Sequence, residues 1–304
     1  MSKATVQPDP TIIGEVAAPP FVLLPDPTRL FVDRTLRLRA LAVRSEIGAY
    51  LHFLSDLTEL QYRIQDDLPE PYMPDGEALT RARTHAMPPL DRAGFIPDAA
   101  LEVTLATLFD AAVDIQKPLA ASEALARVRT ADPTTRDAMQ RDVLAGTIPA
   151  ESLAEHVYVA AVLQVHFTRL AARLDAGSLV PVGNGVCPSC GGPPVSTMVV
   201  GWRGAQGSRF CACALCGTLW HYVRIKCVLC GSTKGIGYQE VEGGAGTVKA
   251  ETCDNCHGYV KVLYQVKDPE LDPVADDVAS LGLDLLLRGG AYRRGSFNPF
   301  LIGY

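Results

Sequence analysis

The sequence predicts an α+β fold, in which an α-helical domain is followed by two tandem four-cysteine metal modules and by a C-terminal helix with an extended tail. Apolar residues recur at helical spacing through the first 180 residues. All nine cysteines lie between residues 187 and 256, and eight of them form four CxxC pairs. We therefore expect domains at 1–180, 181–226, 227–271 and 272–304.

Composition restricts the class of protein. The chain has 304 residues, of which 48% are hydrophobic, so it can bury a core of more than one domain. The formal net charge of −6 argues against a general nucleic-acid binder. No apolar run reaches the roughly 18 residues of a membrane span, and no apolar segment of a secretory signal follows the start. We expect a cytoplasmic protein without membrane insertion.

The first helices follow a proline-rich arm at residues 1–25. Asp26-Pro27 is typical of an N-cap followed by proline at the first helical position. Helical spacing then continues to Ile64, in one long helix or in two with a break near Ser45. Residues 70–97, which are interrupted by prolines, are expected to form a long connection.

Further helices are expected over residues 98–116, 122–128 and 151–174, the last with Gly177 as its C′ residue. Another begins at Asp132-Pro133 and ends near Gly146. Beyond these helices, β-branched and aromatic residues predict strands over 220–225 and 259–266. A last helix is expected from Asp272-Pro273 to Gly289-Gly290, and residues 291–304 form an aromatic tail.

The paired cysteines show an internal duplication. Adding 40 to the first four positions gives the last four. The pairs are Cys187/Cys190, Cys213/Cys216, Cys227/Cys230 and Cys253/Cys256. Gly191 and Gly231, which follow the second cysteine of each leading pair, also align and allow the turn to leave with positive φ.

This spacing is typical of metal binding. Two residues between cysteines let a tight turn direct both thiolates at one point, and two such turns supply a tetrahedron of sulfur for Zn²⁺ or a single iron ion. Disulfides and a thioredoxin-like redox pair fit less well, because the cysteine count is odd and no βαβ pattern is present. We expect two metal ions, one per repeat, with each repeat closing its own site.

A closed site of four cysteines leaves no position for an activated water. The sequence also offers no pairing of nucleophile and base and no phosphate-binding loop, so we expect no enzymatic activity. Residues 187–256 hold six Lys/Arg and four Asp/Glu, a formal charge of +2. Eight thiolates around two divalent ions lower this to about −2, which again argues against nucleic acid.

Several other residues have both a structural and a functional interpretation. Cys211 is either a small buried residue on a strand or a spare thiol near the metal. For His221 and His257 we favour packing or surface roles. Asp276-Asp277 suit the first turn of a helix through its macrodipole, and a functional role is the alternative. The aromatic tail is either a strap over the two four-cysteine modules, which we call the ribbons, or a surface for a partner.

From residue 187 onward, and more weakly before it, the chain resembles the formate dehydrogenase accessory proteins (FdhE). The motifs that carry the resemblance are Cys-Pro-Ser-Cys-Gly (187–191), Cys-Ala-Leu-Cys-Gly-Thr-Leu-Trp-His-Tyr-Val-Arg-Ile-Lys-Cys-Val-Leu-Cys (213–230), Ala-Glu-Thr-Cys-Asp-Asn-Cys-His-Gly-Tyr-Val-Lys (250–261), Lys-Asp-Pro-Glu-Leu-Asp-Pro-Val-Ala-Asp-Asp-Val-Ala-Ser-Leu (267–281) and Asn-Pro-Phe-Leu (298–301). Leu-Pro-Asp-Pro (24–27) and Arg-Leu-Arg-Ala-Leu-Ala (37–42) are also similar to the family.

The resemblance implies a cytoplasmic, chaperone-like maturation factor that binds the catalytic subunit of formate dehydrogenase. It also implies two rubredoxin-like ribbons, with iron as a candidate beside zinc. An electron carrier of the rubredoxin type is the alternative function. The sequence leaves open the metal, self-association, the residues that bind the partner and the role of Cys211.

Overall fold

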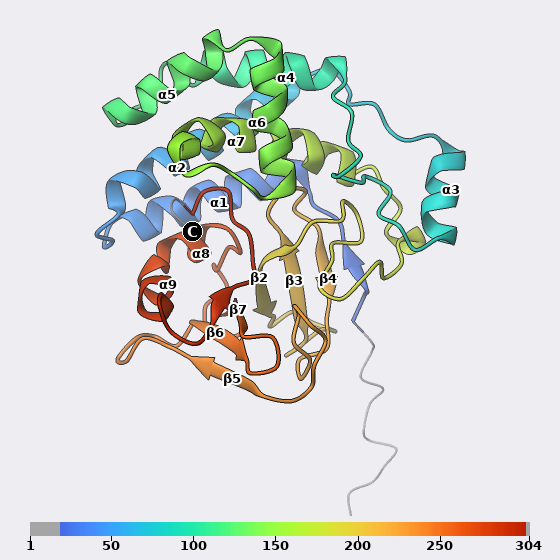
Figure 1. The fold of residues 1–304 in the computed structure, drawn as a ribbon, viewed down its shortest axis with the longest axis vertical. Coiled ribbons are helices and arrows are strands. Elements are labelled where there is room, and N and C mark those ends of the chain that lie inside the picture. Colours follow the sequence, from blue (N-terminus) through green and yellow to red (C-terminus); the bar gives the residue numbers. More distant parts are fainter. Residues whose placement is uncertain (1–18, 302–304) are drawn as a thin grey trace, which may run out of the picture.

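The computed structural model describes residues 19–301. Helices of the N-terminal part gather in one half of the molecule and a β-sheet forms the other half (Figure 1). The expected α+β fold is confirmed. The predicted arm up to residue 18 and the last three residues of the tail lie outside the described residues.

The helices of the first half are α1 (Pro27–Ala42), α2 (Gly48–Arg63), α3 (Gly76–Thr84), α4 (Ala99–Ala111), α5 (Leu119–Thr130), α6 (Pro133–Ala145) and α7 (Leu153–Ala171), with short 3₁₀ turns at Ile64–Asp67, Ala150–Ser152 and Ala176–Ser178. Four of these helices, α1, α3, α4 and α6, begin at an aspartate cap that the sequence provides. Asp26, Asp98 and Asp132 each accept a hydrogen bond from a backbone N–H of the first helical turn.

Three expectations about these helices need refinement. The break near Ser45 exists, so α1 and α2 are separate and antiparallel neighbours. The connection expected at 70–97 contains α3, whose only buried residue is Ala82, so an apolar pattern could not reveal it. Gly177 lies in a 3₁₀ turn rather than at C′, because α7 already ends at Ala171.

The strands of the described residues form a single sheet. They are β1 (Val22–Leu23), β2 (Pro194–Val199), β3 (Arg209–Cys213), β4 (Leu219–His221), β5 (Ile236–Gln239), β6 (Val248–Cys253), β7 (Gly258–Tyr264) and β8 (Arg293–Arg294). Their order is β1-β4-β3-β2-β7-β6-β5, with β8 beside β7.

Each repeat supplies three antiparallel strands, β2–β4 and β5–β7, and the repeats join through the parallel pair β2–β7, where Thr197 lies opposite Val262. Part of the expected arm forms β1, which pairs with β4 of the first repeat so that Val22 lies opposite Trp220. The strand expected at 220–225 stops at His221, since the chain turns there toward the second repeat.

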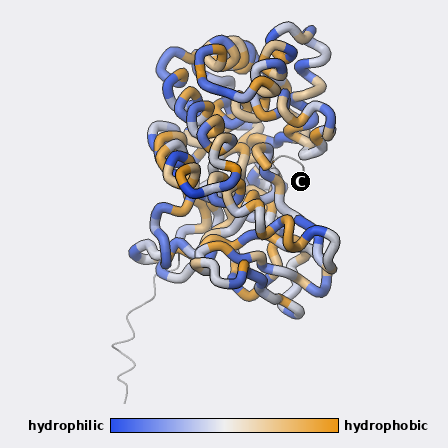
Figure 2. The backbone as a smooth tube through the Cα atoms, turned by 90° about the vertical axis from the view of Figure 1, so that its left-hand side faces the viewer, coloured by the Kyte–Doolittle hydropathy of each residue, from blue (hydrophilic) through white to orange (hydrophobic). Residues whose placement is uncertain are grey.

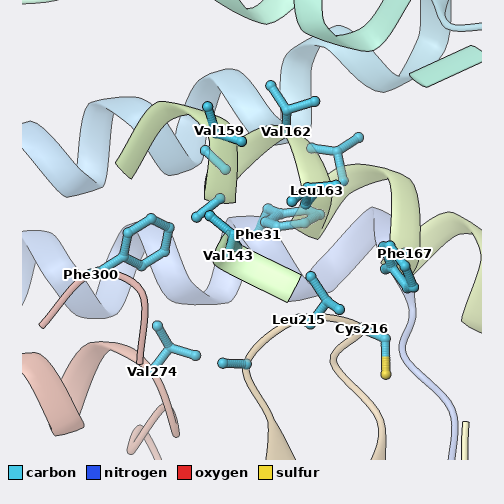
Figure 3. Packing of buried hydrophobic residues seen from close by; sticks show 14 of the residues in the cluster. Phe31, Val143, Val159, Val162, Leu163, Phe167, Leu215, Cys216, Val274 and Phe300 are labelled. Carbon is cyan, nitrogen blue, oxygen red and sulfur yellow. The ribbon is translucent and has the colours of Figure 1, made fainter. Parts of the chain in front are cut away.

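One core connects the helices with the first repeat. Helix α7 is buried on almost every side because it lies among α2, α4, α5 and α6. In Figure 3, Phe31 and Phe167 of the helical half lie in the same cluster as Leu215 and Cys216 of the first repeat. Figure 2 shows the helical half stacked on the sheet half along the long axis, with apolar segments running into both.

The last expected helix is divided into α8 (Ala275–Ala279) and α9 (Leu281–Leu287). Asp276 forms an ion pair with Arg37 of α1. Asp277 lies in a fully buried cluster with Lys261 and accepts hydrogen bonds from Arg294 and Asn298. These carboxylates therefore join segments of the fold, a role that the macrodipole interpretation of the sequence did not include.

The described part of the tail returns to the helical half. Phe300 is buried in the main core, and the Tyr50 hydroxyl of α2 donates to its carbonyl oxygen at 2.7 Å. Of the two expectations for the tail, the strap fits residues 291–301, although it fastens the sheet to the helices instead of covering only the ribbons. Within the described residues no helix combines the length and hydropathy that a membrane span requires.

Candidate metal centres

The first repeat brings four sulfur atoms together. Cys187 and Cys190 lie on the turn before β2, whereas Cys213 ends β3 and Cys216 lies on the turn between β3 and β4. Cys187 Sγ is 3.6 Å from Cys216 Sγ, and Cys190 Sγ is 3.5 Å from Cys213 Sγ. All four sulfurs lie within 4.8 Å of one another, and all four side chains are buried.

The second repeat builds the same arrangement from the same local structure. Cys227 Sγ is 3.9 Å from Cys256 Sγ, and Cys230 Sγ is 3.7 Å from Cys253 Sγ. The turns of both repeats leave through a left-handed glycine, Gly191 with φ of 78° and Gly231 with φ of 76°. This confirms the conformational reason for glycine at these positions.

The sulfur separations fit a metal ion. A tetrahedron with metal–sulfur bonds of about 2.3 Å has edges of about 3.8 Å, and the four separations given above lie between 3.5 and 3.9 Å. A disulfide needs about 2.05 Å, and all nine cysteines are free. The clusters form within the repeats and not across them. Each could hold one ion such as zinc or iron.

Within each cluster the pKa values of the thiols shift in both directions: hydrogen bonds from the other three cysteines lower the pKa of Cys213 in the first cluster, and burial raises the pKa of Cys227 in the second to about 12. Burial raises the pKa of the Cys187 thiol well above its ordinary value. A hydrogen bond from the backbone N–H of Ser232 is the main reason that the pKa of Cys230, near the surface, is lowered to about 7. Because metal ligands bind as thiolates, loading the first cluster must release protons that burial holds on sulfur.

The helical half encloses the first cluster. The backbone N–H groups of Leu90 and Arg92 donate to the carbonyl oxygens of Ser189 and Cys190 at 2.9 and 3.1 Å. From α7, Gln164 Nε2 donates to the carbonyl oxygen of Ala214 at 2.7 Å. Both cysteine turns are thus fixed by segments that lie far away in the sequence.

The second cluster lies at the surface. Cys256 is exposed and Cys230 is half-buried, whereas Cys227 and Cys253 are buried. Asn255 Nδ2 lies 3.5 Å from Cys230 Sγ and donates toward it. The cysteine spacing gives no sign of this difference, because it is the same in both repeats.

The remaining residues of interest lie outside both clusters. Cys211 is fully buried in β3, and desolvation raises its pKa to about 12, which agrees with the interpretation of a small core residue. His221 is half-buried against Phe210, and His257 is exposed. Sequence reasoning missed a buried ion pair between Arg209 Nη1 and Glu251 Oε2, at 2.9 Å, which links the two repeats. No signal in the sequence indicated this pair, because Arg209 and Glu251 are single charged residues outside both predicted strands.

Comparison with known protein families gives three matches along the chain. The model "FdhE, N-terminal" matches residues 19–184, "FdhE, central domain" matches residues 186–224, and "FdhE, C-terminal domain" matches residues 225–301.

Similar proteins and a similar structure carry the same name. A "Protein FdhE homolog" of Rhizobium meliloti is 51% identical over 306 residues, with the whole of both chains covered. One of Pseudomonas aeruginosa is 34% identical, covering 99% of this chain and 98% of its own. The crystal structure of the FdhE protein from Pseudomonas aeruginosa matches with a TM-score of 0.83 and 34% identity, covering 94% of this chain and 99% of that one.

Proposed function

Because the chain belongs to the FdhE family, we propose that it is an accessory factor of formate dehydrogenase. It binds the catalytic subunit of that enzyme in the cytoplasm during assembly and enables its activity without catalysing a reaction itself. The observation that carries this proposal is the match of all three family models, in order, across residues 19–301.

The chemistry of the two clusters supports a role in structure and binding. Each cluster offers four sulfur ligands. A metal ion bound to all of them has no free position for water or substrate, which is the character of a structural site. In each repeat one metal ion, iron or zinc, is proposed to hold the two CxxC turns together. The ligands are Cys187, Cys190, Cys213 and Cys216 in the first repeat and Cys227, Cys230, Cys253 and Cys256 in the second.

The domain organisation is part of the proposal. The helical part at 1–180 provides the frame, the ribbons at 181–226 and 227–271 carry the metals, and the segment 272–304 fastens them to the frame. Ion pairs of Arg34 with Asp272 and of Arg37 with Asp276, at 3.1 and 2.6 Å, support the assignment of a fastening role to this last segment.

A gene deletion tests the proposal. We expect a strain without this gene to lose formate dehydrogenase activity while its formate dehydrogenase transcript and catalytic polypeptide persist. The wild-type gene supplied in trans should restore activity, and the tagged protein should co-purify with the catalytic subunit. Normal activity in the deletion strain would reject the proposal.

A rubredoxin-like electron carrier is the second candidate, and the exposure of Cys256 favours it because electrons would need a short path from the second cluster to a partner. This function requires iron and a reversible one-electron couple. Metal analysis of freshly isolated protein, followed by a redox titration, separates the two. Two zinc ions per chain would exclude electron transfer and leave the accessory role intact.

A further inference from the structure

Repeat-related residues show that the two clusters differ in burial at two ligands, and most strongly at the last one. Cys216 and Cys256 are forty positions apart and close equivalent turns. Cys216 is fully buried, whereas Cys256 is exposed. The residues that follow them, Gly217 with φ of 72° and His257 with φ of 54°, both have left-handed backbone conformation.

Coverage by the helical half explains the difference. A Cβ atom at Gly217 would lie 2.8 Å from Leu30 Cδ2 and 3.1 Å from Pro25 Cβ, so the segment that begins α1 lies directly on this turn. At the equivalent position of the second repeat a full imidazole side chain is present and exposed. Glycine is thus required where the turn is covered, and histidine fits where the turn faces solvent.

An open pocket lies next to Cys256. Its walls are formed by Gly258, Gly290 and Gly295, by Leu229, and by the two residues Arg293 and His257. Arg293 is exposed, and among the described residues its guanidinium has no ion-pair partner. Arg294, also at the pocket, is already engaged by Asp277 and Asp284. The lining contains no carboxylate.

We infer that Cys256 is the exchangeable ligand of the second cluster and that the thiolate of another molecule takes its place. The molecule that bears this thiol, its carrier, binds in the pocket. In the exchange the bond between the metal and Cys256 Sγ breaks, and a bond to the incoming sulfur forms. The proton of the incoming thiol is transferred to Cys256, so charge and oxidation state are unchanged. The unpaired Arg293 favours a carrier with negative charge, such as a cysteine within an acidic peptide. This inference does not depend on the proposed function.

Alkylation of the metal-loaded, full-length protein tests the first part. Iodoacetamide is added below stoichiometry, and modified cysteines are located by peptide mass spectrometry. We expect Cys256 to react about tenfold faster than Cys216 or more, since the buried thiolate needs local opening of the structure. One metal ion should leave while the other stays. Equal rates at the two cysteines, or earlier reaction at Cys187, would overturn the inference.

Chemical rescue tests the second part. Cys256→Ser protein loaded with Co²⁺ should show a weakened sulfur-to-cobalt absorption band, which both 2-mercaptoethanol and glutathione restore. The matched variant Cys216→Ser should not be restored, and if it fails to fold, the alkylation rates of the wild-type protein decide. Absence of rescue by either thiol in a folded Cys256→Ser protein would contradict the exchange.

Charge reversal at Arg293 separates the two kinds of carrier. In the Cys256→Ser background, Arg293→Glu should raise the concentration of anionic glutathione needed for half-restoration. The concentration of neutral 2-mercaptoethanol should stay the same. If neither concentration changes, or if both rise together, Arg293 does not select the carrier. Rescue by 2-mercaptoethanol alone would show that the pocket does not admit a peptide.

Discussion

Arg209 in β3 and Glu251 in β6 form an ion pair at 2.9 Å, although their strands belong to different repeats and both side chains are almost fully buried. Tyr238 donates a second hydrogen bond to the same carboxylate oxygen at 3.0 Å. The guanidinium also donates to the carbonyl oxygens of Arg224 and Lys226, which lie on the connection between the repeats. This one side chain therefore contacts both ribbons and the segment that links them.

Removing the arginine should be strongly destabilising. We expect Arg209→Ala to lower the free energy of unfolding by about 3–5 kcal/mol, because Glu251 would remain buried without its charged partner. Urea denaturation followed by circular dichroism measures this. The matched control is Lys249→Ala, forty residues later, whose half-exposed pair with Glu240 should contribute less than about 1 kcal/mol. Equal losses in both variants would show that the buried pair has no special role.

The tail should contribute to stability through Phe300. Its ring is buried in the core of the helical half, so Phe300→Ala should cost about 3–5 kcal/mol of folding free energy. The exposed Leu286 of α9 serves as the control, since Leu286→Ala should change stability by no more than about 0.5 kcal/mol. Thermal and urea unfolding measure both. A tail that served only a partner would leave the stability of Phe300→Ala unchanged.

His166 should make the helical half sensitive to acid. Its ring is buried in α7 beside Phe95 and Phe167, and desolvation lowers its pKa to about 4. The unfolded chain takes up this proton near pH 6.5, whereas the folded chain resists until about pH 4. Stability from this group is therefore complete above pH 6.5 and is lost as the pH falls toward 4.

The measurement is the free energy of unfolding at several pH values. His166→Phe should flatten its decline between pH 6.5 and 4, while His52→Gln, at an exposed position of α2, should leave the slope unchanged. An unchanged slope in His166→Phe would assign the acid sensitivity to other groups.

Local patterns predicted those parts of the fold that depend on neighbours in the sequence. The caps at Asp26, Asp98 and Asp132 act within one helical turn, and the CxxC spacing alone brings two sulfurs together. Helix α3 was not predicted, because it buries so little apolar surface that no helical pattern of apolar residues marks it. The division of the last helix at Ser280 could not be predicted either, because Ser280 is neither of the residues that commonly break a helix, glycine and proline.

Long-range relationships explain the rest. The sequence placed four sulfurs in each repeat, but it contained no information about what covers them. Burial of the first cluster depends on residues 88–92 and on the start of α1, which are distant along the chain. The roles of Asp276 and Asp277 likewise depend on Arg37 and Arg294, which the fold alone brings near.

Native mass spectrometry of the freshly purified full-length protein tests most directly whether the two clusters are separate metal sites. We predict two metal ions per chain, and one ion each after Cys190→Ser and Cys230→Ser. Cys211→Ser should retain both ions, because this buried thiol belongs to neither cluster. A wild-type chain that carries fewer than two ions, or a Cys211→Ser chain that loses one, would contradict this assignment of the eight cysteines.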